Sequence, residues 1–376
     1  MSEKLHIALL FGGNSSEHDV SKRSAHNIYD GMDKNKYDVS LFMITKDGII
    51  INDEFSRRIF DGEDEDAVVK EAYATMDLTS PLAPVMALQS VPEIDFFYPV
   101  VHGNLGEDGT LQGLFRLLKK PYIGAGIAAS AMSFDKELTK RVLDQAGIRN
   151  TKYVVVTPDN QAEMTWDVVS AKLGKLVFVK PAKQGSSVGI HMAKNADEFQ
   201  AAIADAMTYD YKVLVEEGIK NPREIEISIL GNDHPIASKL GGLRIPDGDD
   251  FYDYNNKFVD ASGVVFDLPV IVDEALEQEI REMALATYKA LELKGLARLD
   301  FLVDENNVPY MGEPNTLPGF TNISLYPQMW NVSGIGYSEL IDRLIELGIE
   351  EFNHQNELRY DFQSLGEEHV GQKNYN

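Results

Sequence analysis

Two short stretches in the C-terminal part of the sequence carry charged and amide side chains at alternate positions. Arg298 and Asp300 are separated by one residue, and the same spacing recurs in Glu313 and Asn315. Alternate residues of a β-strand share a face, so each pair is expected to project to one side. If the stretches form a hairpin across residues 304–307, that face combines oxygen ligands suited to Mg²⁺ with a guanidinium. The alternative is an exposed polar hairpin, which the apolar neighbours of the two stretches disfavour.

A lysine at the end of an apolar stretch is a second candidate for chemistry. Lys180 closes the stretch 177–180 and is followed by the serine- and glycine-rich segment 185–189. Backbone N–H groups and hydroxyls of such a segment can approach a phosphate while the lysine supplies charge. A lone lysine at a strand end is more often only a solvated charge. There is no Walker motif, and the turn Gly12-Gly13 lacks the dinucleotide-binding spacing.

The first third of the sequence has the pattern of a parallel sheet with crossover helices. Apolar runs that read as buried strands alternate with helical patterns, and a glycine turn follows the first run. The predicted strands span 5–11, 37–45 and 95–102, and the predicted helices begin at 15 or 16 and span 109–120. This unit is expected to end near residue 124.

The remainder of the sequence is expected to form antiparallel sheets. Strands on both sides of the loop 183–187 suggest a small antiparallel lid. The predicted strands span 152–157, 176–182, 212–217, 224–230, 235–245, 297–303 and 309–313, with another ending near 192, and the predicted helices span 134–147, 196–209, 273–293 and 338–347. An irregular segment as long as 246–263 is usually functional.

The composition argues against several classes of function. A chain of 376 residues, 44% apolar and 25% charged, is expected to fold into two or three globular domains. The apolar runs are too short to span a membrane and the start does not resemble a signal peptide, so we expect a cytoplasmic protein. A net charge of −25 argues against nucleic-acid partners, and the lack of cysteine excludes thiolate chemistry. The acidic run 61–66 is interpreted as a solvated loop.

A series of ordered motifs resembles the D-alanine:D-alanine ligases of the ATP-grasp superfamily over nearly the whole chain, up to about residue 350. These motifs are Gly12–Glu17, His102-Gly103, Gly106–Thr110, Asp135-Lys136, Val179–Pro181, Gly185–Gly189, Arg223-Glu224, Phe251–Tyr254, Arg298–Asp300, Glu313–Thr316 and Pro318–Thr321. The resemblance implies an α/β chain with the ATP-grasp fold. Its expected parts are an N-terminal substrate-binding domain with a parallel sheet (1–124), a central lid (125–215) and a C-terminal catalytic domain with an antiparallel sheet (216–376).

The same resemblance implies which residues bind ATP and metal. Residues matching the family's nucleotide contacts are Lys136, Lys180, Ser187, Glu216, Glu224 and Tyr252. Residues matching its ligands for two Mg²⁺ ions, which Mn²⁺ could replace, are Asp300, Glu313 and Asn315. Two metal ions are physically sensible, because a protein of this net charge cannot by itself neutralise ATP and a growing acyl phosphate.

The resemblance also implies a substrate site. Glu17 is expected to anchor the ammonium of the first D-alanine, with His102 and Ser186 nearby, although a carboxylate in a first helical turn can serve the helix dipole alone. The other matched positions are Arg298 and the Gly319 N–H as oxyanion stabilisers, and Ser324 with Lys257 at the carboxylate of the second substrate. The implied reaction forms an acyl phosphate from D-alanine and ATP, which a second nucleophile then attacks.

One position departs from the pattern of dipeptide-forming members, which usually carry a tyrosine after the residue matching Lys257. The hydroxyl of that tyrosine ties the closed loop to a glutamate and a serine, and Phe258 cannot form this hydrogen bond. In this the sequence resembles the D-alanine:D-lactate ligases associated with vancomycin resistance. We therefore expect D-alanyl-D-lactate for peptidoglycan precursors as the product. The alternative is that Phe258 is a neutral packing substitution in a D-alanine:D-alanine ligase.

The sequence disfavours two other kinds of function. A non-catalytic nucleotide-binding module would be expected to have lost metal ligands or Arg298, and the sequence retains all of them. Another ATP-grasp enzyme with a larger substrate would be expected to lack the pattern formed by Glu17 and Ser324. The expected partners are therefore small molecules, namely ATP, D-alanine and D-lactate, and the resemblance implies a homodimer.

Overall fold

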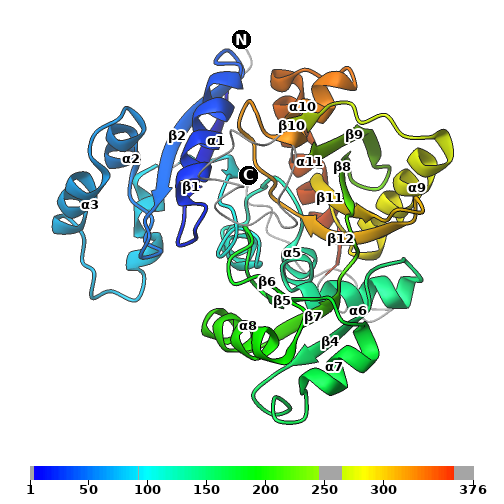
Figure 1. Cartoon of the computed structure of the whole chain (residues 1–376). Coiled ribbons are helices and arrows are strands. Elements are labelled where there is room, and N and C mark those ends of the chain that lie inside the picture. Colours follow the sequence, from blue (N-terminus) through cyan, green and yellow to red (C-terminus); the bar gives the residue numbers. More distant parts are fainter. Residues whose placement is uncertain (1–3, 92, 245–264, 360–376) are drawn as a thin grey trace, which may run out of the picture.

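The computed structural model describes residues 4–91, 93–244 and 265–359, and the strands of these ranges form three β-sheets (Figure 1). The first sheet contains β1 (Leu5–Gly12), β2 (Tyr37–Ile44) and β3 (Phe96–Pro99) in the order β2-β1-β3. Both neighbours run parallel to β1, which confirms the predicted parallel sheet. Among the described helices, none is long and apolar enough to cross a membrane.

Helices cover both faces of the first sheet. They are α1 (His18–Gly31), α2 (Asp53–Phe60), α3 (Glu65–Ala74), the 3-10 helix η1 (Ala83–Ser90) and α4 (Thr110–Leu117). Ile7 and Leu9 belong to one apolar cluster while Ala8 and Leu10 belong to another, as the alternation of a strand requires. The interpretation of 61–66 as a solvated loop is wrong at its end, because Asp64 caps α3 and the next residue lies in its first turn.

The middle sheet is antiparallel, as predicted for the lid. It contains β4 (Tyr153–Val156), β5 (Val177–Pro181), β6 (His191–Ala193) and β7 (Val213–Glu217) in the order β4-β7-β5-β6. The helices α7 (Trp166–Leu173) and α8 (Ala196–Tyr209) pack on it through a cluster that includes Val177, Val179 and Phe199. β5 and β6 are joined by the serine- and glycine-rich segment, which is therefore held at its two ends by paired strands.

The third sheet is also antiparallel and supplies the hairpin with the alternating charged residues. It contains β8 (Arg223–Leu230), β9 (Ile236–Arg244), β10 (Val265–Asp267), β11 (Leu296–Val303) and β12 (Pro309–Asn315), in the order β10-β9-β8-β11-β12. The helix α9 (Glu274–Ala290) contacts β8, β9, β11 and β12 and buries Leu276, Ile280 and Ala284 at helical spacing.

The remaining helices connect these units. They are α5 (Ile127–Phe134), α6 (Lys136–Ala146), α10 (Leu325–Val332) and α11 (Tyr337–Asn356). Leu143 of α6 belongs to the apolar cluster of the third sheet, whereas Leu340 and Leu344 of α11 belong to the cluster beneath the first sheet. Because helices cross between units in this way, the domain boundaries at 124 and 215 stay a prediction.

Candidate active site

The hairpin of β11 and β12 brings together the charged residues predicted to share a face. In its register Arg298 lies opposite Asn315 and Asp300 lies opposite Glu313. The Arg298 guanidinium donates two hydrogen bonds to the Asp300 carboxylate, of 2.8 and 2.7 Å, and lies 2.9 Å from Glu226 Oε2 on β8. The Asn315 amide donates to Asp300 Oδ2 at 3.0 Å. The exposed-hairpin alternative therefore does not hold for Arg298 and Asp300, whose side chains are 15% and 21% exposed, whereas the Glu313 side chain is 42% exposed.

Arg298 is held as a cation by the carboxylates around it. Burial alone would lower the pKa of its guanidinium, but the charges of Asp300 and Glu226 raise that pKa well above its usual value. A two-point contact of this kind fixes the orientation of the planar guanidinium as well as its charge. The group is thus oriented before any substrate arrives.

Both predicted phosphate-binding lysines lie beside glutamates. The Lys180 amine is 2.5 Å from Glu216 Oε2, and the Lys136 amine is 3.5 Å from Glu313 Oε2. Burial alone would lower the pKa of Lys180, but the charge of Glu216 raises it above its ordinary value. The Lys136 amine also donates to the carbonyl of Gln184 at 2.5 Å, which connects α6 to the segment between β5 and β6.

Glu216 lies between two lysines, one of which sequence reasoning missed. Its Oε1 is 2.9 Å from the amine of Lys140, on α6, while Oε2 contacts Lys180. Burial would raise the pKa of Glu216, but the positive charges of Lys180 and Lys140 lower it to about 2. A helical lysine four residues after Lys136 carries no sequence signal that separates it from an ordinary solvated lysine.

A cavity of about 1170 Å³ opens between the middle and third sheets. Seven of the residues predicted to bind ATP or metal line it: Lys136, Lys180, Ser187, Glu216, Glu224, Asp300 and Glu313. Apolar side chains such as Phe178, Ile219 and Phe301 line it as well. The cavity thus has both the apolar surface that a base ring requires and the charges that phosphates and metal ions require.

Those predicted substrate residues that the structure describes, Glu17, His102 and Ser324, lie in loops outside this cavity, and two further loops approach Glu17. Its carboxylate approaches the segment between β5 and β6 so closely that a Cβ added to Gly185 would lie 3.1 Å from Oε2. On its other side a Cβ added to Gly103 would lie 3.7 Å from the same oxygen. His102 is buried, and its Nδ1 lies 2.8 Å from the carbonyl oxygen of Leu317. The structure therefore places His102 and Glu17 on the same side of the site.

Ser186 and Ser187 lie in a strained part of the segment between β5 and β6. Their φ values of 54° and 59° lie in the left-handed region that non-glycine residues seldom adopt. The hydroxyl of Ser186 is buried and has no hydrogen-bond partner among the described residues. A buried hydroxyl without a partner costs about 1–3 kcal/mol, so a ligand that bonds to it would recover that energy.

Gly319 and Ser324 lie together at the start of α10. A Cβ added to Gly319 would lie 3.0 Å from Ser324 Oγ, so the two residues are in close contact. The Ser324 hydroxyl also accepts the Thr321 N–H at 3.0 Å and lies 2.7 Å from the Thr321 hydroxyl. Tyr252, Lys257 and Phe258, which were also predicted for the site, lie outside the described residues.

Glu107 is a second residue that sequence reasoning missed, although it lies within one of the motifs. Its carboxylate accepts the N–H groups of Gly103 at 2.8 Å, Thr316 at 3.1 Å and Leu317 at 3.0 Å. Burial and the charge of Glu17 raise the pKa of this carboxyl, although the bonding N–H groups oppose that shift. Glu107 therefore joins the loop after β3 to the loop that follows the metal-binding candidates of β12.

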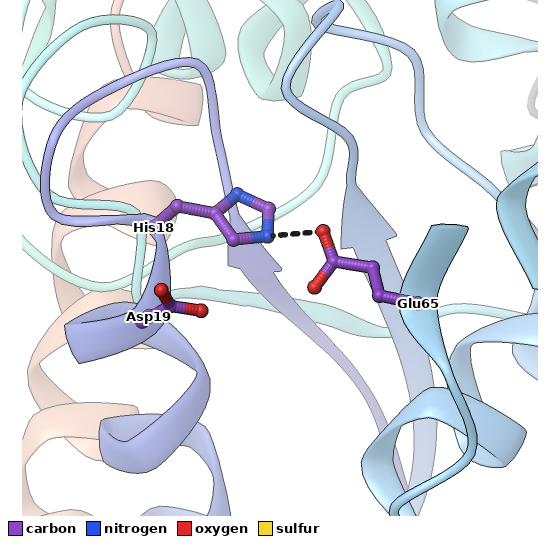
Figure 2. Close-up of side chains that lie close together, drawn as sticks. All are labelled: His18, Asp19 and Glu65. Atoms are coloured by element: carbon purple, nitrogen blue, oxygen red, sulfur yellow. Dashed lines mark ion pairs between the residues drawn. The ribbon is translucent and has the colours of Figure 1, made fainter.

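A cluster of charged side chains fixes the first turn of α1, directly after Glu17. Figure 2 shows the buried His18 ring facing Glu65 of α3, with 3.0 Å between Nε2 and Oε1. One histidine and two carboxylates, with Asp19 as the second, could be mistaken for a metal site. However, the Lys22 ammonium contacts Glu65 and lies 3.5 Å from Asp19, so a cation of the protein already pairs with both.

Comparison with known proteins agrees with this arrangement. The family model for the D-ala D-ala ligase N-terminus matches residues 6–125, and that for the C-terminus matches residues 142–346. The chain is similar to the D-alanine–D-alanine ligase of Limosilactobacillus fermentum, with 75% identity over 374 residues that cover 100% of this chain and 99% of the relative. It is also similar to that of Limosilactobacillus reuteri, with 71% identity and 100% of both chains covered.

Solved structures of related enzymes share the fold. The D-alanine-D-alanine ligase from Coxiella burnetii has a TM-score of 0.79 and 35% identity, covering 94% of this chain and 98% of that one. The D-Ala:D-Ser ligase VanG from Enterococcus faecalis has a TM-score of 0.76 and 31% identity, covering 92% and 100%. These likenesses confirm the predicted mixed α/β ATP-grasp fold.

The comparisons contradict the expected product. We predicted D-alanyl-D-lactate and a link to vancomycin resistance from Phe258, but five relatives of 62% to 75% identity are all D-alanine–D-alanine ligases by name. The identity of the single residue Phe258 was thus a poor guide to the acceptor. With two family models matching and relatives this similar, the chain belongs to the D-alanine–D-alanine ligase family of ATP-grasp enzymes and is an ATP-dependent ligase.

Proposed function

We propose that this enzyme joins two D-alanine molecules into D-alanyl-D-alanine for the bacterial cell wall, with ATP and Mg²⁺. The observation that carries the proposal is the approach of the Glu17 carboxylate to Gly185, next to the charged cavity between the middle and third sheets. An ammonium anchor and a phosphate-binding segment are thereby adjacent. The names of the similar enzymes support D-alanine as both substrates.

The nucleotide is proposed to bind in the cavity with its phosphates toward Lys136 and Lys180. Asp300, Glu313 and Asn315 fit a magnesium site because all three can offer oxygen, the donor that this ion prefers. Bound there, Mg²⁺ would neutralise phosphate charge. Asn315 now donates its amide N–H to Asp300, so its amide must turn to present the oxygen instead. Mn²⁺ could take the same ligands.

The first step proposed is attack of a D-alanine carboxylate oxygen on the γ-phosphorus of ATP, with ADP leaving. Glu17 holds the ammonium of this D-alanine, and the hydroxyl of Ser186, which has no partner in the described part of the chain, offers a polar contact beside it. Lys136 and Lys180 keep the phosphates in line for the transfer. The product of the step is D-alanyl phosphate.

The second step is attack of the amine of another D-alanine on the carbonyl carbon of the acyl phosphate. Arg298 and the Gly319 N–H are proposed to stabilise the oxyanion of the tetrahedral intermediate, which expels phosphate as the amine loses its proton. Ser324 and Lys257 are proposed to bind the carboxylate of the second D-alanine. His102 is proposed to lie beside the first D-alanine, on the side of Glu17, and its Nδ1 contacts the carbonyl oxygen of Leu317.

A competition assay tests the proposal. The purified enzyme is given ATP, Mg²⁺ and D-alanine, with and without D-lactate or D-serine, and the products are separated by mass. We expect D-alanyl-D-alanine as the main product, with one phosphate released for each dipeptide. A main product containing D-lactate or D-serine, or phosphate release without dipeptide, would contradict it. Sedimentation of the same sample tests the proposed homodimer.

A further inference from the structure

Lys140 is a buried lysine that none of the proposed steps uses. Only 1% of its surface is exposed, yet its amine has four polar atoms within reach. They are Glu216 Oε1 at 2.9 Å, Thr151 Oγ1 at 2.8 Å, the Thr151 carbonyl at 3.1 Å and Asn150 Oδ1 at 3.2 Å. A buried ammonium is costly unless it is paired and hydrogen-bonded. Because the four contacts meet this requirement, the position of the Lys140 amine is closely fixed.

The contacts of Lys140 join parts of the molecule that border the nucleotide cavity from different sides. Lys140 lies on α6, whose Leu143 packs in the apolar cluster of the third sheet. Glu216 lies on β7 of the middle sheet, and Thr151 lies in the segment that enters that sheet. The amine of Lys140 therefore ties the middle sheet to α6, the helix that packs against the third sheet.

The contact between Lys140 and Glu216 changes the net charge at the cavity wall. Glu216 and Lys180 line the cavity, whereas Lys140 lies behind them. Alone, Glu216 and Lys180 would form a neutral pair and offer little attraction to a polyphosphate. With Lys140 on the other carboxylate oxygen, the three groups carry a net positive charge, which attracts a polyphosphate.

We infer that Lys140 is a positioning residue for nucleotide binding, which acts through Glu216 to keep Lys180 in place and its charge available to the phosphates. The inference rests on the proposed function for the cavity and the lysines that line it. It does not require Lys140 to touch ATP. Lys140 touches no ligand, but it sets the orientation of Lys180 and the net charge around it. Its loss should therefore change nucleotide affinity much more than turnover.

The test compares Lys140→Met, which keeps the length of the side chain and removes its charge, with the parent enzyme. We expect the Kd for ADP with Mg²⁺, measured by calorimetry without D-alanine, and the KM for ATP each to rise roughly 10-fold. The kcat at saturating ATP and the KM for D-alanine should change by less than about 3-fold. Lys294→Met is the matched control, because Lys294 also pairs with two carboxylates, Asp233 and Glu351, but lies away from the cavity.

A double-mutant cycle separates a role through Glu216 from general loosening of the fold. If Lys140 acts through Glu216, then Lys140→Met should cost little further ADP affinity in a Glu216→Gln background. Additive losses, or an unchanged ADP affinity in Lys140→Met, would overturn the inference. So would an equal loss of ADP affinity in Lys294→Met, because the effect would then follow stability alone.

The same measurements distinguish a failure of this inference from a failure of the proposed function. If the parent enzyme binds ADP but makes no D-alanyl-D-alanine, the proposed reaction fails while the role of Lys140 is still measured by ADP affinity. If the parent enzyme makes the dipeptide and Lys140→Met binds ADP normally, the role of Lys140 fails alone. If the parent enzyme binds no ADP, the nucleotide site itself is wrong and both proposals fall.

Discussion

The nucleotide end and the amino-acid end of the site are built in different ways. At the nucleotide end, side chains on paired strands hold one another through charge, as Lys180 does with Glu216 and Arg298 does with Glu226. At the amino-acid end, loops from distant parts of the chain are held through their backbone, as Glu107 holds Thr316 and Leu317. Substitutions that remove a charge should therefore impair the nucleotide end more than substitutions in its loops. The amino-acid end should depend on the buried carboxylate of Glu107, which joins its loops.

The largest effect is expected at Glu313, where the nucleotide end is proposed to hold metal. Glu313→Ala should reduce phosphate release below detection at saturating Mg²⁺, because the phosphate charge is no longer neutralised. Thermal unfolding should stay near that of the parent enzyme, since the side chain is 42% exposed. Glu305→Ala, at an exposed position in the turn of the same hairpin, is the control. Normal turnover in Glu313→Ala would remove Glu313 from the metal site.

A smaller but still large effect is expected at Arg298, which is proposed to stabilise the oxyanion. Arg298→Lys keeps the charge but loses the planar group that contacts Asp300 at two points, so kcat should fall by about 10²-fold or more. Steady-state kinetics with both substrates varied measures this. Arg281→Lys, on the far helix α9, should leave kcat unchanged. A change confined to the KM for ATP would assign Arg298 to nucleotide binding instead.

Glu107 is the residue whose loss should affect one end only. In Glu107→Gln an amide N–H₂ replaces an oxygen that accepts backbone N–H groups, so the loop at Leu317 should loosen. We expect the KM for D-alanine to rise roughly 10-fold while the KM for ATP changes little, a split that initial rates can measure. Asp108→Asn, which alters the same loop without contact to Leu317, is the control. An equal rise in both KM values would show that the two ends are not separable.

The smallest expected effect is in the pH dependence, which should differ between the two ends. The lowered pKa of Glu216, about 2, keeps it ionised throughout the working range, so the stability it contributes is present in full above its ordinary pKa and is lost progressively as the pH falls from there toward 2. The raised pKa of Glu107 means that it takes up a proton at higher pH than an ordinary glutamate. As the pH falls, the KM for D-alanine should therefore rise more steeply in the parent enzyme than in Glu107→Gln, which cannot take up this proton, whereas the pH dependence of ADP affinity should be the same in both proteins. Equal pH profiles of the KM for D-alanine in the two proteins would contradict the assignment.

Sequence reasoning succeeded where a local rule connects residue spacing to geometry. The alternation of strands was enough to place Arg298, Asp300 and Glu313 on one face, and the structure pairs these strands in the predicted way. It did not find Lys140 or Glu107, because each acts on partners that are far away in the sequence. Glu107, for example, bonds to residues more than two hundred positions later. No spacing rule predicts such a contact before the fold is known.

The packing of α11 has a consequence for the order of events during protein synthesis. Leu340, Ile341 and Leu344 complete the apolar cluster beneath β1, and Gly348 approaches so closely that an added Cβ would lie 2.8 Å from the ring of Phe96. β1 thus receives part of its apolar covering from a helix that is synthesised more than three hundred residues later. Until α11 has been made, the face containing Ile7 cannot be buried completely and is open to non-native contacts or to a chaperone.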